Sequence, residues 1–359
     1  MNKKLKIAII GTGSIAENHI HAYQKNPQAE LYAFCDISEK RLQKMGEKYG
    51  VTRLYTDKDA MLAELPEIDA VSVCTWNSAH APCTIAALKA GKHVLCEKPM
   101  ATSAPEAREM LAAAREAGKL LMVGFVRRYG NDCHILKEFV NQGYFGNIYY
   151  SKATYLRRNG SPGGWFGMKE FSAGGPLIDL GVHVIDLTRY IMGNPRPVSV
   201  YGATFHKLGD RRELKDRKAY TAASATGKEP FDVEDLATAM IRYDNGSLVS
   251  VEASFSLNLK QDEGTIQFFG TKAGARLNPE LELYTETNGY MADVNLCVPT
   301  ALSFDGLFEN EINHYVDCIQ HNIPCVSPAE DGVTLMEILD AIYESARTGH
   351  EVVINSYTP

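Results

Sequence analysis

The chain has no apolar run close to the ~20 residues that a membrane-spanning helix requires. It opens with Met1-Asn2-Lys3-Lys4 and passes directly into an apolar stretch, which leaves no room for a signal peptide. We therefore expect a cytoplasmic protein that contacts no membrane.

An excess of positive charge is also missing. Lysine and arginine number 37 against 44 aspartates and glutamates, a net charge of -7, which gives no general attraction for a polyanion. Nucleic acid is thus not expected as a partner.

The eight cysteines form no Cys-x-x-Cys pair. Cys35, Cys74 and Cys96 lie in apolar stretches, as reduced core residues do. We expect neither a disulfide framework nor a structural zinc site.

A length of 359 residues exceeds what one core organises and predicts two domains, 1–126 and 127–359. In the first, apolar runs alternate with helical patterns, which indicates a parallel sheet covered by helices. A helix over 104–117 is marked by Ser103, Glu106 and Gly118. The predicted strands are 6–10, 30–36, 70–75, 92–96 and 120–125.

From Gly146 onward, longer strand-like runs predict an α+β domain with a large, mainly antiparallel open sheet. Asp244-Asn245-Gly246-Ser247 indicates a hairpin with a two-residue loop. Residues 207–230 are expected to be a surface loop, and 308–318 and 333–346 to be helices. The predicted strands are 147–157, 197–206, 234–243, 247–257 and 264–269.

The first chemical motif is Gly11-Thr12-Gly13-Ser14-Ile15-Ala16, between a predicted strand and a predicted helix. The first glycine permits a tight turn, and the second lets the backbone approach a pyrophosphate at the positive end of the helix. Asp36 ends the next strand and would bind the ribose hydroxyls of NAD while repelling the 2'-phosphate of NADP. The predicted cofactor is therefore NAD. Asp36 makes NADP less favoured, but the nearby Arg41 leaves NADP as an alternative.

The second motif is Glu97-Lys98-Pro99, where an apolar strand ends. A lysine at the carboxyl end of a strand, in a chain with a dinucleotide-binding turn, suggests a base beside a nicotinamide. Partial burial and the positive nicotinamide would both favour the neutral form of the amine.

Asp179 and His183 are four residues apart, so both project from one face if the segment is helical. That spacing suits shared contact with a substrate. The same pair could hold a metal, but no third ligand stands out by its spacing, and no catalytic metal is expected.

Taken together, these motifs resemble those of the Gfo/Idh/MocA family, the glucose-fructose oxidoreductase and inositol dehydrogenase type. The resemblance rests on Gly11 to Ala16, on Glu97-Lys98-Pro99, on Gly124-Phe125 with Arg127-Arg128, and on Gly174 to Asp186. Thr75-Trp76-Asn77 with His80 stands where the family has a Thr-Pro-Asn and a histidine near the nicotinamide.

The resemblance implies an NAD-dependent oxidoreductase acting on a secondary hydroxyl of a sugar, cyclitol or related polyol. It gives Lys98 the role of base with a cis peptide bond before Pro99, makes His183 a proton shuttle or hydroxyl ligand, and has Asp179 orient His183 or bind another hydroxyl. The expected cofactor contacts are Gly11, Gly13, Ser14, Ile15, Asp36, Thr75, Trp76, Asn77, His80, Glu97 and Lys98. The expected substrate contacts are Lys98, Arg128, Trp165, Asp179 and His183.

Some of these assignments have equally good structural explanations. Arg127 and Arg128 could be charges at a domain joint, and Trp165 with Phe166 could form either an aromatic wall for a sugar or part of a core.

Two other activities stay open from the sequence. One is an NAD-dependent glycosidase that oxidises its substrate transiently, and the other is a non-catalytic dinucleotide sensor. The family's usual subunit interface is the open face of the second sheet, which implies a homodimer or homotetramer.

Overall fold

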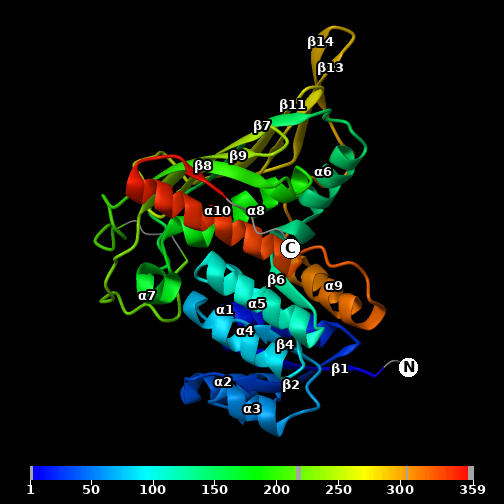
Figure 1. Ribbon diagram of the computed structural model, residues 1–359, viewed down its shortest axis with the longest axis vertical. Coiled ribbons are helices and arrows are strands. Elements are labelled where there is room, and N and C mark those ends of the chain that lie inside the picture. The colour runs from blue at the N-terminus through cyan, green and yellow to red at the C-terminus, as the bar shows by residue number, and fades with distance from the viewer. Residues whose placement is uncertain (1–2, 216–219, 305, 355–359) are drawn as a thin grey trace. The chain divides into compact units, whose positions relative to one another are not determined.

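The computed structural model divides the chain into two compact units (Figure 1). The first comprises Met1–Val126 and Asp305–Val333, and the second comprises Arg127–Phe304 and Thr334–Pro359. Within them, the structure describes residues 3–215, 220–304 and 306–354. The first unit thus includes Asp305–Val333. The predicted single boundary after residue 126 would assign this segment to the second domain.

The first unit is built on a six-stranded sheet in the order β3-β2-β1-β4-β5-β6, with every neighbouring pair parallel. This confirms the predicted parallel sheet of an α/β domain, and the strand order is that of a Rossmann fold. The order places the carboxyl ends of β1, β4 and β5 side by side at one edge. The strands are β1 (Leu5–Ile10), β2 (Ala29–Cys35), β3 (Leu54–Tyr55), β4 (Ala70–Val73), β5 (His93–Glu97) and β6 (Leu121–Gly124).

Helices connect these strands, as the alternation in the sequence predicts. The helix over 104–117 has the expected signals, because the Ser103 hydroxyl accepts the Glu106 N–H and Gly118 adopts the left-handed conformation at its end. The helices of this part are α1 (Ser14–Lys25), α2 (Glu39–Tyr49), α3 (Lys58–Glu64), α4 (His80–Lys89) and α5 (Ala104–Ala117).

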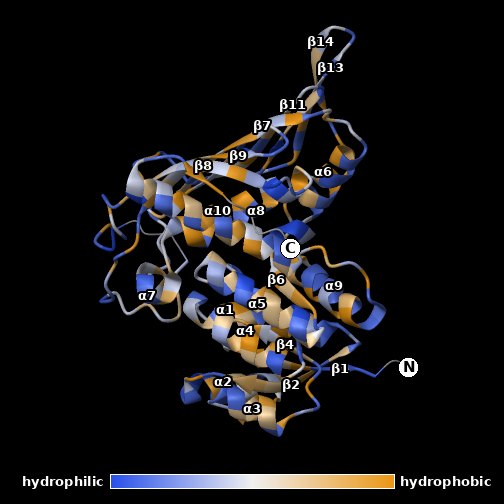
Figure 2. Ribbon diagram, viewed as in Figure 1, coloured by the Kyte–Doolittle hydropathy of each residue, from blue (hydrophilic) through white to orange (hydrophobic). Residues whose placement is uncertain are grey.

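A further helix, α9 (Leu307–His321), completes the first unit by packing on α1. The side-chain amide of Asn26, at the end of α1, donates a hydrogen bond of 2.7 Å to Asn313. Hydrophobic and hydrophilic residues alternate around α9 in Figure 2, as expected of a helix with one buried face. The helix predicted over 308–318 is thereby confirmed and extended.

The second unit holds a nine-stranded sheet in the order β14-β13-β12-β11-β7-β10-β9-β8-β15. Only the β7–β10 pair is parallel, so the predicted antiparallel character is confirmed. The strands are β7 (Ile148–Leu156), β8 (Pro197–Phe205), β9 (Leu236–Tyr243), β10 (Leu248–Ser254), β11 (Glu263–Gly270), β12 (Ala273–Leu277), β13 (Glu282–Thr287), β14 (Tyr290–Val294) and β15 (Val352–Val353).

One face of this sheet is much less covered than the other. Along β9, Ala237, Ala239 and Ile241 are buried, whereas the intervening Met240 and Arg242 are exposed. Because successive side chains of a strand point to opposite faces, this alternation marks an open face.

The tight turns of this sheet differ from the prediction. Arg242 pairs with Leu248, and the Tyr243 N–H donates to the Ser247 carbonyl at 3.0 Å, which leaves the three-residue loop 244–246. Gly246 has a φ of +83°, and the expected two-residue loop at Asn245-Gly246 is wrong. A two-residue loop joins β13 to β14 instead. There Asn288 and Gly289 both have positive φ, as a type I′ turn requires.

The helical elements of this unit include a short π-helical turn, Leu177–Gly181, which runs directly into α8. Among the described residues of 207–230 no helix or strand occurs, in agreement with the expected loop, and 216–219 lie outside the described residues. The helices are α6 (Asn131–Asn141), α7 (Lys169–Ser172), α8 (Val182–Ile191) and α10 (Ala329–Thr348), and the division between the units falls within α10.

All eight cysteines are described and are free thiols, and Cys35, Cys74 and Cys96 are buried as expected. In the described part of the chain, no helix has the length and apolar character needed to cross a bilayer.

A buried ion pair ties the start of the second unit to α8. Arg128 makes two hydrogen bonds to Asp186, from Nε at 3.0 Å and from Nη2 at 2.6 Å, and its guanidinium lies 4.6 Å from the centre of the Tyr190 ring. The side chains of Arg128 and Asp186 are 0% and 5% exposed. Such a pair costs desolvation when it forms, but losing one partner leaves an uncompensated charge in the core.

We expect Asp186→Ala to lower the free energy of unfolding of the second unit by about 3–5 kcal/mol, because it strands the Arg128 guanidinium. Urea unfolding followed by Trp165 fluorescence, in a Trp76→Phe background, isolates this unit, since the chain has two tryptophans. Arg347→Ala, which removes the exposed pair with Glu344, is the control and should cause no measurable change. Equal effects of the two substitutions would contradict a structural role for the buried pair.

Candidate functional site

The turn after β1 requires glycine at position 11. Gly11 has a φ of +87°, and a Cβ atom there would lie 2.7 Å from the carbonyl oxygen of Cys74. Both features exclude other residues. The turn therefore runs against the loop that follows β4, the neighbouring strand.

The same turn leaves an open approach at the start of α1. A Cβ atom added to Gly13, the N-cap residue of α1, would meet nothing within 4 Å. No side chain caps the first N–H groups of the helix, and Gly13, Ser14 and Ile15 are all at least partly exposed. Uncapped N–H groups at a helix start favour an anion, so these residues fit a dinucleotide's pyrophosphate.

Asp36, just after β2, is fastened to this turn. Its Oδ2 accepts hydrogen bonds from the backbone N–H of Thr12 at 2.7 Å and from the Thr12 hydroxyl at 2.9 Å, and its Oδ1 accepts the N–H of Ser38 at 2.8 Å. The Arg41 guanidinium reaches Oδ2 at 3.5 Å. Each carboxylate oxygen has two acceptor positions, and Oδ1 accepts one of these hydrogen bonds, so Oδ1 keeps capacity for a ribose hydroxyl.

The loop after β4 carries Thr75, Trp76, Asn77 and His80. Thr75 and Trp76 are partly exposed, whereas Asn77 and His80 are buried. The His80 Nδ1 lies 2.7 Å from the carbonyl oxygen of Pro99 and Nε2 lies 3.2 Å from that of Thr75. Burial lowers the pKa of His80, against the opposing effect of the two carbonyls, which favours the neutral ring. His80 thus joins the loops after β4 and β5, and its buried ring argues against direct contact with a cofactor.

Lys98 is the one partly exposed residue in the segment from Val94 to Ala101, whose other members are all buried. It follows β5 directly, and the Lys98–Pro99 peptide bond is cis, as the resemblance implies. A lysine that emerges alone from a buried segment, at the sheet edge where the Gly11 turn lies, is accessible to a ligand held there.

Glu97 anchors the residue that follows it, Lys98. Glu97 is 6% exposed, and its carboxylate accepts hydrogen bonds from His19 Nε2 at 2.8 Å and from the Lys98 N–H at 3.1 Å. A Cβ atom at Gly124 on β6 would lie 3.2 Å from the carboxylate carbon, so this glycine makes room for it. Burial acts to raise the pKa of Glu97, but the His19 hydrogen bond and the nearby charges of His19 and Lys98 outweigh it, and the pKa is lowered. Its bonds lie within the protein, and a contact of this carboxylate with cofactor stays a prediction.

Glu311, on α9, lies near Glu97 and was not anticipated from the sequence. Its side chain is fully buried, and neither carboxylate oxygen has a hydrogen-bond partner. Burial and the adjacent charge of Glu97 raise the pKa of Glu311 well above its usual value. The two pKa shifts are opposite in direction, which favours an ionised Glu97 beside a neutral Glu311. This pairing could not be predicted from local patterns, because the two glutamates are 214 positions apart, from 97 to 311.

In the second unit, Asp179 and His183 emerge from a buried segment in the same manner as Lys98. Between Leu177 and Arg189 all residues except these two are buried. The segment is helical, as expected, but Asp179 lies in the π-helical turn and His183 in α8. A π-turn holds slightly more residues per turn than an α-helix, so four positions still bring both side chains to one side. Such turns are frequent at functional sites.

Glu234 holds the start of this helical segment, and the sequence analysis does not predict this role. Its carboxylate accepts the N–H groups of Gly175 at 2.9 Å and Leu177 at 3.2 Å, and the Tyr343 hydroxyl at 2.9 Å. Burial raises the pKa of Glu234, against these hydrogen bonds. A Cβ atom at Gly175 would lie 2.2 Å from the Glu234 carbonyl oxygen, which explains the Gly174-Gly175 lead-in.

Two predicted substrate contacts have different outcomes in the structure. The Arg128 guanidinium is fully buried against Asp186, which argues against a substrate contact and assigns it to packing. Trp165 is partly exposed and stacks on Phe166 with ring centres 3.9 Å apart. An aromatic wall therefore stays a prediction for this pair.

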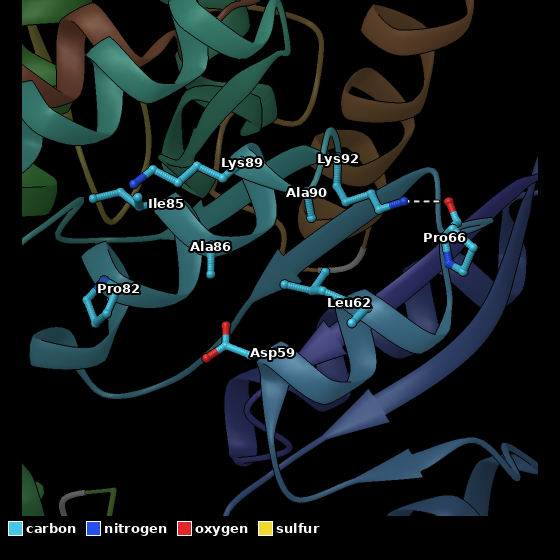
Figure 3. Close-up of a pocket in the computed structure, with 10 residues that line it drawn as sticks. Asp59, Leu62, Pro66, Pro82, Ile85, Ala86, Lys89, Ala90 and Lys92 are labelled. Carbon is cyan, nitrogen blue, oxygen red and sulfur yellow. Dashed lines mark hydrogen bonds between the residues drawn. The ribbon is translucent and has the colours of Figure 1, made fainter.

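A pocket of the first unit lies elsewhere, between α3 and α4 (Figure 3). Its lining includes Asp59, Leu62, Ile85 and Lys89, and none of the predicted site residues belongs to it. Lys92 points along its rim and donates a hydrogen bond to the Pro66 carbonyl.

Two family models match the chain. The oxidoreductase family with an NAD-binding Rossmann fold matches residues 5–125, and the C-terminal alpha/beta domain of the same oxidoreductase family matches residues 137–354. The chain belongs to the Gfo/Idh/MocA family. The first unit is accordingly an NAD-binding Rossmann domain, and the resemblance expected from the motifs is confirmed.

Relatives of this family member include sugar and inositol dehydrogenases. The chain is 36% identical over 351 residues to the D-glucoside 3-dehydrogenase of Escherichia coli (strain K12), with 97% of each chain covered. It is 30% identical over 268 residues to the myo-inositol 2-dehydrogenase of Thermotoga maritima, which covers 75% of this chain and 73% of that protein.

A solved structure of levoglucosan dehydrogenase in complex with NADH has the same fold, with a TM-score of 0.85 at 23% identity over 99% of this chain and all of that one. An oxidoreductase domain protein from Kribbella flavida is similar at a TM-score of 0.86 and 25% identity, with coverage of 99% and 100%.

The raised pKa of Glu311 predicts a pH-dependent stability. Its stabilising contribution is fully present below the unfolded carboxyl pKa of about 4.3 and is lost as the pH rises toward the raised folded pKa. Glu311→Gln copies the neutral acid and cannot ionise, so the variant should become increasingly more stable than the parent between pH 5 and 8. Urea unfolding followed by Trp76 fluorescence in a Trp165→Phe background measures this difference. The control, Glu309→Gln, changes a partly exposed carboxylate of α9 whose surface ion pair with Lys25 contributes little, so it should leave the pH dependence nearly unchanged. Parallel curves for the parent and Glu311→Gln would refute the assignment.

Proposed function

We propose that this oxidoreductase oxidises a secondary hydroxyl of a pyranose sugar, a cyclitol or a related polyol, with NAD as hydride acceptor. The observation that carries the proposal is Lys98, an accessible amine at the carboxyl edge of the NAD-binding sheet. The relationship to a D-glucoside 3-dehydrogenase over nearly the whole chain makes glucosides the first substrates to test.

The residues fit the binding of a dinucleotide at the Gly11 to Ile15 turn, with its adenosine ribose at Asp36. Bound there, the nicotinamide would supply the acceptor for a hydride from the substrate carbon. The protein must then supply a base for the hydroxyl proton.

We assign that base to Lys98. The Glu97 carboxylate accepts the backbone N–H of Lys98 and thereby fixes the main chain at this residue. Its Nζ, as the neutral amine, takes the hydroxyl proton while the carbon–hydrogen bond breaks, so the product is a carbonyl compound.

The second unit contributes Asp179 and His183 in this proposal. Both are partly exposed on one side of a helical segment that Glu234 and Asp186 hold in place. Asp179 accepts a substrate hydroxyl, and His183 binds a hydroxyl or relays the proton. The stacked pair of Trp165 and Phe166 offers an apolar surface for the face of a sugar ring.

The open face of the second sheet supports a homodimer or homotetramer. Exposed apolar residues there, such as Tyr201 and Met240, favour coverage by another chain. The relatives named above are dehydrogenases, and nothing in the comparisons supports a glycosidase or a non-catalytic sensor.

We expect Lys98→Ala to lower turnover by about 10²–10⁴-fold, the range that a general base contributes, while NAD binding is kept. NADH formation is measured with a panel of glucosides, aldoses and inositols, and NAD binding by calorimetry. Lys98→Arg, which keeps a positive charge but cannot lose its proton, should be equally inactive. Undiminished turnover in either variant would remove Lys98 from the mechanism.

The cofactor preference has its own test. Asp36→Ser removes the carboxylate and releases Arg41 to meet a 2'-phosphate, so the ratio of kcat/KM for NADP to that for NAD should rise. The ratio is informative even if the turn loosens, because instability lowers both values together. Asp36→Ser with Arg41→Ala should lose the gain, and an unchanged ratio in Asp36→Ser would show that Asp36 does not select the cofactor.

A further inference from the structure

Three side chains of types that bind metal ions lie close together toward the end of α9, and none of them is assigned above to the redox reaction. His314 and Cys318 are four residues apart on α9 and therefore lie on the same side of it. Cys325 lies in the loop that follows. Its sulfur, the Cys318 sulfur and a ring nitrogen of His314 all lie within 4.8 Å of one another.

The spacing of these atoms matches a tetrahedral metal site. Zinc–sulfur bonds of about 2.3 Å and zinc–nitrogen bonds of about 2.0–2.1 Å place sulfur and nitrogen roughly 3.5 Å apart across a tetrahedral centre. The Cys318 Sγ lies 3.3 Å from the His314 Nε2. This pair is therefore already close to the separation that coordination requires.

The His314 ring also presents the correct nitrogen. Nε2 accepts a hydrogen bond of 2.9 Å from the backbone N–H of Val326, so this nitrogen carries a lone pair and no proton. Coordination would exchange that hydrogen bond for a metal–nitrogen bond.

The two thiols differ in their surroundings. Cys318 is buried, and its thiol is hydrogen-bonded to the Cys325 thiol. Cys325 and His314 are partly exposed, which gives a cation an entry path and leaves a fourth position for water.

We propose that His314, Cys318 and Cys325 form a zinc site with three protein ligands and one position open to water. Two thiolates and an imidazole select zinc over hard cations such as magnesium, which take oxygen ligands. Binding replaces the thiol protons, which pass to solvent, and no oxidation or reduction is involved. The site joins the end of α9 to the loop that leads into α10, and it uses none of the residues of the proposed reaction.

The test uses the full chain, reduced and stripped of metal with a chelator, and titrated with Co²⁺ and then Zn²⁺. We expect one Co²⁺ per chain, with thiolate-to-cobalt charge transfer and the visible bands of a tetrahedral centre, both lost when Zn²⁺ displaces it. Cys318→Ser, Cys325→Ser and His314→Asn should each weaken binding by at least about tenfold, since removing a ligand costs no less than removing an outer-shell partner. Absence of these bands in the reduced protein would overturn the proposal.

Two substitutions elsewhere in the chain serve as matched controls. Cys297→Ser changes an exposed thiol of the second unit, and His321→Asn changes an exposed histidine of α9. Both should bind Co²⁺ as the parent does, and equal weakening in the controls would also overturn the site. Circular dichroism of each variant identifies misfolding, and His314→Asn and Cys325→Ser, which alter partly exposed positions, decide the matter if the buried Cys318→Ser variant is unstable.

Discussion

The buried carboxylate of Glu97 is the constraint on which the first unit depends. A desolvated charge is tolerated in a core only when hydrogen bonds compensate it, and here they come from α1 through His19 and from the main chain of Lys98. The glycine on β6 supplies the space. The carboxylate therefore fixes α1, β5 and β6 relative to one another, and it determines where the chain leaves the sheet. Because Glu97 is held in the core, the chain leaves the sheet at Lys98, and the lysine side chain is accessible.

The second unit uses the same physical device with other residues. Glu234 accepts two N–H groups at the start of the helical segment, and Asp186 receives the Arg128 guanidinium one turn beyond His183. These bonds fix the backbone on both sides of Asp179 and His183, whose own side chains stay accessible. In each unit, buried carboxylates position a backbone from which a few polar side chains project. Precision of this kind is what a hydroxyl-oxidising site requires, because proton transfer depends on short, directed contacts.

Much of this architecture could be predicted from local patterns. The Rossmann strands are continuous apolar runs, and the cap and stop residues of α5 lie within four residues of the helix, so the sequence carries their signals directly. Strands β12 to β15 were not predicted because they are short and mixed in composition. The π-helical turn was not predicted because it does not change the spacing of apolar residues. The failed hairpin shows the limit of a dipeptide signal. Asn245-Gly246 and Asn288-Gly289 share the same letters, and only strand pairing tells a three-residue loop from a two-residue one.

The features that could not be predicted depend on partners far apart in the chain. Glu311 sits beside Glu97, and its neutral state follows from that proximity and not from its neighbours on α9. The thiol and imidazole cluster lies one turn further along the same helix, and Cys325 also contributes to the raised pKa of Glu311. A dipositive ion bound by two thiolates replaces two neutral thiols without a change in net charge. Coordination there would thus leave the electrostatic balance between Glu311 and Glu97 unaltered, and any coupling to Lys98 would have to travel mechanically, through the position of α9 on α1.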